Sequence, residues 1–122
     1  MMNHPPAALT HEALRALHCA PLGPAQALSG EPLRTLLQTV PHWSVTDGFL
    51  VARFTFGSWF ETLGFVNAVA WMAQTQDHHP ELLVAYNRCE IRWNTHSAHG
   101  ITLNDFICAA RTDALAAGPP AS

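Results

Sequence analysis

Residues 58–80 of this chain read SWFETLGFVNAVAWMAQTQDHHP. Ser58 followed three residues later by Glu61 has the spacing of a capping box. In this motif the serine side chain bonds the backbone amide of the glutamate, and the glutamate side chain bonds that of the serine, so we expect a helix to begin here. Apolar residues at helical spacing continue from this point to about Gln76. Polar residues and Pro80 then end the pattern, which predicts one long helix followed by an irregular junction.

The apolar side of this predicted helix is wide. We expect its central stripe to consist of Trp59, Leu63, Val66, Ala70 and Ala73. Phe65, Val69 and Met72 lie outside that stripe, so the helix has to be covered on more than one side, by a sheet and by a second subunit that buries Phe65 or its neighbours. Charged and polar residues interrupt the run, which favours a buried helix over a membrane span.

Strand-like segments lie on both sides of the long helix. In residues 42–56, Asp47-Gly48 separates two such runs, and Leu50, Ala52 and Phe54 alternate with more polar residues. This pattern predicts a β-hairpin with one apolar face. Residues 82–94 alternate in the same way, and Tyr86-Asn87 within them leaves two readings open, one long strand or two strands joined by a tight turn.

Further helices are expected at both ends of this core. Ser29 is a helix cap with Pro32 in the first turn, and Thr102 with Asp105 caps a helix that continues to Gly118. The resulting order of elements favours an α+β fold, an antiparallel four-stranded sheet with helices packed on one face. We expect a partly mobile N-terminal segment over 1–30, one domain over 31–117 and a frayed tail over 118–122.

Composition limits the function classes. A chain of 122 residues with 48% hydrophobic residues suits a single compact domain. Six basic residues against nine acidic ones, without a basic cluster, argue against a nucleic-acid ligand. Cys19, Cys89 and Cys108 are three cysteines without C-x-x-C spacing, which is typical of a reducing compartment. Since no secretory pattern opens the sequence, we expect a cytoplasmic protein without a membrane partner.

Four of the eight histidines lie between residues 75 and 106. Adjacent side chains such as His78 and His79 diverge on regular backbone, so both face one cavity only at an irregular helix end. Imidazole there suits proton transfer near neutral pH, and the negative end of the helix dipole favours protonated His78. His96-x-x-His99 leaves a metal site open as an alternative, and ordinary structural histidines are another. No nucleophile elbow, phosphate loop or dinucleotide motif is present.

The same region resembles the signature of the pterin-4a-carbinolamine dehydratase family. The matching residues, in the family's spacing, are Gln74, His78-His79-Pro80, Tyr86, His96 and Asp105. The resemblance extends over about residues 41–115. Two positions depart from the family pattern: Gln74 stands where an acidic residue is usual, and Leu82 stands where many members carry tryptophan.

The resemblance implies a hydro-lyase that removes water from a 4a-hydroxytetrahydropterin to give the quinonoid dihydropterin, a step in tetrahydrobiopterin recycling. It implies no cofactor and no metal, a homodimer or homotetramer, and an aromatic amino acid hydroxylase as a possible protein partner. His78, His79 and His96 would be the catalytic residues. Trp43, His79 and Asp105 would bind the pterin, and Gln74, Asp77 and Pro80 would support the site.

Proteins of this type also suggest a second function class. Family members serve as a dimerisation cofactor for a transcription factor, and dehydratase-like proteins assist Rubisco assembly, so a non-enzymatic interaction module on the same fold is the alternative. The retention of His78, His79 and His96 favours the enzyme, because an abandoned site has no need of three histidines.

Overall fold

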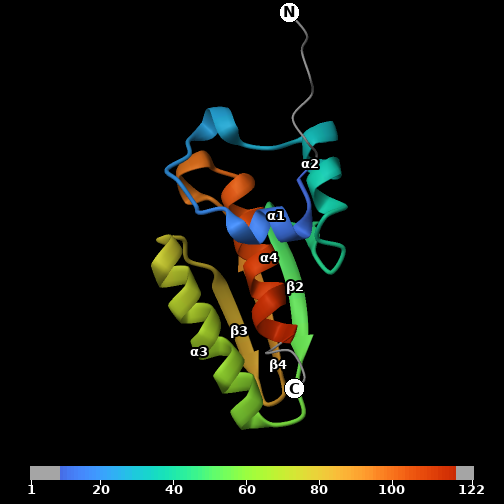
Figure 1. Ribbon diagram of the computed structural model, residues 1–122, viewed down its shortest axis with the longest axis vertical. Helices are drawn as coiled ribbons and strands as arrows, with labels where there is room; N and C mark the ends of the chain where they lie inside the picture. The colour runs from blue at the N-terminus through green and yellow to red at the C-terminus, as the bar shows by residue number, and fades with distance from the viewer. Residues whose placement is uncertain (1–8, 118–122) are drawn as a thin grey trace, which may run out of the picture.

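The computed structural model describes residues 9–117, and its core is one antiparallel sheet (Figure 1). The strands are β1 (Ser44–Thr46), β2 (Phe49–Thr55), β3 (Glu81–Ala85) and β4 (Arg88–Trp93), and they lie in the order β1-β2-β4-β3. The two long helices, α3 (Trp59–Gln76) and α4 (Leu103–Ala117), cover the same face of the sheet. The predicted α+β fold with a four-stranded sheet is confirmed.

Two tight turns set the sheet topology. Asp47 and Gly48 have φ of 52° and 78°, which is the conformation that a two-residue hairpin turn requires, and they join β1 to β2. Tyr86 and Asn87 separate β3 from β4. Of the two readings of residues 82–94, two strands joined by a turn is therefore the one observed.

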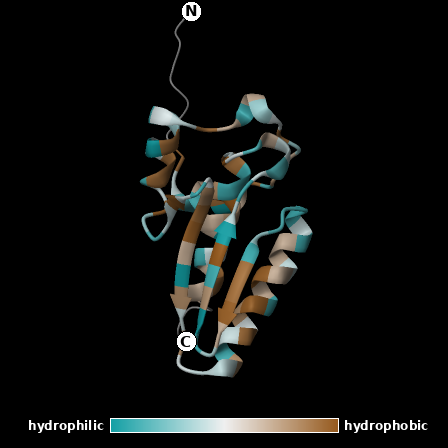
Figure 2. Ribbon diagram, turned by 180° about the vertical axis from the view of Figure 1, so that it is seen from behind, coloured by the Kyte–Doolittle hydropathy of each residue, from teal (hydrophilic) through white to brown (hydrophobic). Residues whose placement is uncertain are grey.

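In each of the two central strands, every second residue is apolar and faces the helices. Leu50, Ala52 and Phe54 of β2 lie opposite the buried Trp93, Ile91 and Cys89 of β4. The other parity is polar and carries Arg53 paired with Glu90 at 2.9 Å. Figure 2 shows the sheet from this side, with the helices behind it.

The predicted stripe of α3 is wrong by part of a turn. The residues that α3 buries are Thr62, Phe65, Val69, Met72, Ala73 and Gln76, whereas Trp59 keeps 43% of its surface exposed. Because this helix is apolar on nearly every side, its periodicity does not select the face that meets the sheet. Phe65 belongs to the core of its own subunit, so it is not the residue that a second subunit covers. That its neighbours are buried between subunits stays a prediction.

The N-terminal part packs onto the domain. It contains α1 (His11–Ala16), a short 3₁₀ turn η1 (Pro24–Gln26) and α2 (Gly30–Leu37). α1 lies against α4 and buries Leu14 completely in the common core. The domain boundary at residue 30 stays a prediction. The mobility expected for this segment stays a prediction. The expected frayed tail lies outside the described residues.

Two further elements complete the chain. α4 begins after Thr102, as predicted, and a second 3₁₀ turn, η2 (His96–Ala98), follows β4. Within residues 9–117, no helix combines the length and apolar character needed to cross a membrane.

Candidate active site

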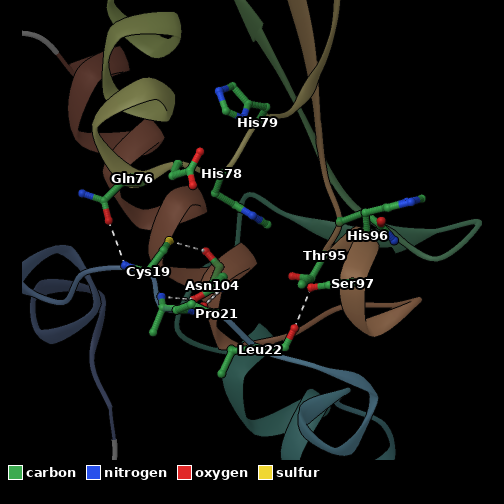
Figure 3. A pocket seen from close by; sticks show the side chains of 13 residues that line it. Cys19, Pro21, Leu22, Gln76, His78, His79, Thr95, His96, Ser97 and Asn104 are labelled. Carbon is green, nitrogen blue, oxygen red and sulfur yellow. Dashed lines mark hydrogen bonds between the residues drawn. The ribbon is translucent and has the colours of Figure 1, made fainter.

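A cavity of about 480 Å³ lies where the C-terminal ends of α3 and β4 meet the start of α4 (Figure 3). His78, His79 and His96 all line it, so the structure brings together the three histidines that the sequence singled out. Its other lining residues are Cys19, Ala20, Pro21, Leu22, Gln76, Asp77, Asn94, Thr95, Ser97 and Asn104. A cavity of this size is typical of small-molecule sites.

The end of α3 orients the histidine pair. Asp77 adopts the left-handed conformation with φ of 49°. The amide of His78 donates to the carbonyl of Ala73 at 3.1 Å, and the amide of Asp77 donates to Gln74 at 3.2 Å. These are the two bonds of a Schellman motif, which reverses the chain sharply after a helix. The supporting role expected for Asp77 therefore has a physical basis in the backbone of this turn.

Asp105 anchors His78. Its carboxylate is fully buried, and its Oδ1 lies 2.6 Å from Nε2 of His78. Its Oδ2 accepts hydrogen bonds from the Thr95 hydroxyl and from the backbone amide of Thr102, both at 2.8 Å. Since the Thr102 amide begins α4, one carboxylate both caps that helix and orients the catalytic candidate.

The ring of His78 is also held by stacking. It lies nearly parallel to Trp93, with the ring centroids 5.5 Å apart and an interplanar angle of 8°. Burial lowers the pKa of His78, but the hydrogen bond and the negative charge of Asp105 outweigh burial, so the pKa of His78 is raised above its usual value. Because Asp105 takes Nε2, Nδ1 is the nitrogen left to exchange a proton.

His79 points away from its neighbour. Its Nε2 lies 3.2 Å from Oε1 of Gln74, and the side chain is exposed (Figure 3). The sequence assigned Gln74 a supporting role, and the structure gives it His79 as its partner. An acidic residue at position 74 would thus place its charge beside His79.

His96 approaches the cavity from the opposite wall, at the start of η2 (Figure 3). It is exposed, and its ring centroid lies 6.3 Å from that of His99. His99 itself does not appear among the residues that line the cavity. Within residues 9–117, no three His, Cys, Asp or Glu side chains gather in a group that could hold a metal ion.

Two residues predicted to bind the substrate do not line this cavity, and their roles stay predictions. Trp43 is buried in the core, where its indole nitrogen donates to Asp113 at 2.8 Å and its ring meets Phe54 edge-on, and it does not line this cavity. Asp105 lies behind His78, to which it is hydrogen-bonded, and also does not line the cavity. Pro80 follows the histidine pair and precedes β3, as expected for a residue that ends the turn.

The sequence missed one wall of the cavity, residues 19–22. Asn104 holds this wall with two bonds to the backbone of Ala20, at 2.7 Å and 3.1 Å. Buried Gln76 accepts the amide of Cys19 at 2.8 Å, and Ser97 donates to the carbonyl of Leu22 at 2.6 Å. Side chains that bond backbone atoms more than fifty residues away leave no periodic trace, so no sequence pattern marked this segment.

Comparison with known proteins places the chain in a family. A profile described as "Pterin 4 alpha carbinolamine dehydratase" matches residues 26–115. The chain belongs to the pterin-4a-carbinolamine dehydratase family. The resemblance found in the sequence is thus confirmed, although the roles of the individual site residues stay predictions.

Relatives and solved structures agree with this placement. The chain is 44% identical over 102 residues to a provisionally named pterin-4-alpha-carbinolamine dehydratase of Chromobacterium violaceum, covering 84% of this chain and 94% of the relative. A relative of the same provisional name from Bdellovibrio bacteriovorus is 45% identical over 95 residues and covers 75% and 79% of the two chains.

Two solved structures share the fold. One, a transcriptional coactivator/pterin dehydratase from Brucella melitensis, matches with a TM-score of 0.71 and 30% identity over 74% of this chain and 98% of its own. The other is a pterin dehydratase-like protein identified as a RuBisCO assembly factor in the alpha-carboxysome. It matches with a TM-score of 0.52 and 27% identity. The match covers 61% of this chain and 86% of that protein's chain.

Proposed function

We propose that this chain dehydrates a 4a-hydroxytetrahydropterin to the quinonoid dihydropterin by histidine acid/base catalysis, without a cofactor. The observation that carries the proposal is the buried pair of Asp105 and His78, 2.6 Å apart, behind a cavity that His79 and His96 also line. Family membership supplies the substrate class.

The reaction needs two proton transfers. The C4a–O bond breaks when a proton reaches the hydroxyl oxygen, and the C=N bond forms when a base takes the proton on N5, so the products are the quinonoid dihydropterin and water. In our proposal His78 is the acid, because Asp105 keeps it protonated and leaves its Nδ1 for the cavity. His96 on the opposite wall is the base, and His79 orients the pterin. Exchange with solvent then restores both histidines.

The polar walls suit a pterin ring. Gln76, Asn94 and Asn104 bring amide groups to the cavity, and Thr95 and Ser97 bring hydroxyls. Because these groups also hold the walls through bonds to Cys19, Gly48, Ala20, Asp105 and Leu22, a pterin would pair with the lone pairs and protons that those bonds leave over. We place the reaction in the cytoplasm, which agrees with three free cysteines, and an aromatic amino acid hydroxylase is the expected source of the substrate.

The alternative is an interaction module without catalysis, and the likeness to a RuBisCO assembly factor is the observation that supports it. One feature favours the enzyme. The bond from Asp105 to His78 orients a cavity histidine and is separate from the bond by which Asp105 caps α4, so a docking surface does not require it.

The direct test is a dehydration assay on 4a-hydroxytetrahydropterin made in place by an aromatic amino acid hydroxylase. We expect the decay of the 4a-hydroxy species to accelerate in proportion to the concentration of this protein, and heat-denatured protein serves as the control. Decay at the solution rate with folded protein would reject the enzyme and favour the interaction module.

We also propose that the protein is a homodimer or homotetramer that associates through the outer face of α3. Phe60 and Trp71 on this helix are 85% and 73% exposed, although both are large and apolar. At micromolar concentration, sedimentation velocity should detect a dimer or tetramer, and Trp71→Glu should shift it towards monomer. Gln38→Glu, directly after α2 and also exposed, is the matched control. Wild-type protein that sediments as a monomer would reject this prediction.

A further inference from the structure

Two cysteines meet beside the candidate site. Sγ of Cys19, in the cavity wall, lies 3.5 Å from Sγ of Cys108 on α4. The third cysteine, Cys89, is buried in β4 on the sheet. The contact joins positions 89 residues apart in sequence, and the proposed dehydration uses neither thiol.

The two thiols differ in exposure and acidity. Cys19 is partly buried and lines the cavity, so a small oxidant can reach it, whereas Cys108 is buried. The hydrogen bond from Cys108 lowers the pKa of Cys19 against the effect of burial, and the nearby His78 lowers it further. That same bond and burial raise the pKa of Cys108. Burial, together with the charge of the neighbouring Glu90, raises the pKa of Cys89 to about 11. Reactive cysteines have this combination of access and low pKa, and inert ones lack it.

We propose that Cys19 and Cys108 form a peroxide-sensitive pair, in which a hydroperoxide oxidises Cys19 and Cys108 then closes a reversible disulfide within one chain. The Cys19 thiolate attacks a peroxide oxygen, the O–O bond breaks, and the released hydroxide takes up a proton to become water. The Cys108 sulfur then attacks the sulfenic acid on Cys19, loses its proton, and displaces a second molecule of water. The peroxide gains the two electrons that the two thiols lose.

Disulfide formation changes the cavity. The sulfur atoms must approach to about 2.05 Å to form the bond. We expect Cys19 to move rather than Cys108, because Cys19 lies outside any helix or strand whereas Cys108 lies within α4. The movement carries the wall formed by residues 19–22 towards α4. It also removes the negative charge of Cys19, which contributes to the raised pKa of His78. The oxidised protein should therefore have a displaced wall and a lower His78 pKa.

The first test is oxidation of the fully reduced, full-length protein by a few equivalents of hydrogen peroxide at neutral pH, followed by thiol alkylation and peptide mapping. We expect a Cys19–Cys108 cross-link within one chain, the loss of two of the three thiols, and full reversal by dithiothreitol. Cys89→Ser should behave like wild type. Oxidation that leaves all three thiols free, that involves Cys89 first, or that cross-links separate chains would reject the proposal.

Variants of the pair sharpen the test. In Cys108→Ser, and in Cys108→Ala as a second version in case serine disturbs the core, Cys19 should stop at the sulfenic acid and be trapped by a dimedone probe. In Cys19→Ser, Cys108 should stay reduced. NMR titration of the His78 ring should give a lower pKa in oxidised than in reduced wild type, and the same pKa in treated and untreated Cys19→Ser. An unchanged His78 pKa on oxidation would contradict our inference that the disulfide alters the candidate active site. These outcomes do not depend on the proposed dehydratase activity.

Discussion

The double variant His78→Ala/His96→Ala is expected to dehydrate 4a-hydroxytetrahydropterin no faster than the uncatalysed reaction. Both proton transfers then lack their catalysts, and each lost acid or base typically lowers kcat by about 10² or more. Each single variant should show at least that reduction unless the two histidines partly replace one another. The measurement is kcat and KM in the coupled hydroxylase assay.

Three replacements serve as controls for the double variant. His79→Ala should mainly raise KM, because a residue that holds the pterin equally in ground and transition states affects binding rather than turnover. His99→Ala and His18→Ala should alter neither constant much, since neither residue lines the cavity. A folded double variant as fast as wild type would refute acid/base catalysis by these histidines.

The variant Asp105→Ala is expected to lose about 3 kcal/mol or more of unfolding free energy. The substitution leaves three donors near the core without their acceptor, namely Nε2 of His78, the Thr95 hydroxyl and the Thr102 amide, and breaking one side of a buried pair typically costs about this much. Urea unfolding at pH 7 measures the loss. Glu31→Ala, which removes an exposed surface ion pair with Arg34, is the matched control and should change little.

The more conservative Asp105→Asn separates charge from packing. It keeps an oxygen for the Thr102 amide but lacks the charge that raises the pKa of His78. In wild type, folded His78 holds its proton more tightly than unfolded His78. Its contribution to stability is therefore complete below the unfolded pKa of 6.5 and is lost as pH rises through the higher folded pKa. Asp105→Asn should lose this pH dependence and show a lower His78 pKa by NMR. The same pKa in both proteins would show that Asp105 does not tune His78.

Signals within a few residues of one another determined most of the fold. The spacing of Ser58 and Glu61 predicted the start of α3, and Oγ of Ser58 does accept the amide of Glu61 at 3.1 Å. Thr102 and Asp105 predicted the start of α4, and Asp47-Gly48 predicted the hairpin. Such bonds close rings of a few residues, so they depend little on the rest of the chain. The histidine signature could also be recognised from the sequence, because its residues lie at the end of one helix and beside one strand and therefore keep a fixed spacing.

Tertiary structure alone decided which surfaces meet. The sequence by itself determined that α3 is apolar, but not which of its sides covers the sheet, because Trp59 and Trp71 are as apolar as the residues that are buried. It also did not place Trp43 on Asp113, residues 19–22 against the cavity, or Cys19 beside Cys108. These contacts join residues separated by 57 to 89 positions. They form only when α1, α3 and α4 pack together, since the free energy of each contact depends on burial and geometry that the whole fold creates rather than on any local pattern.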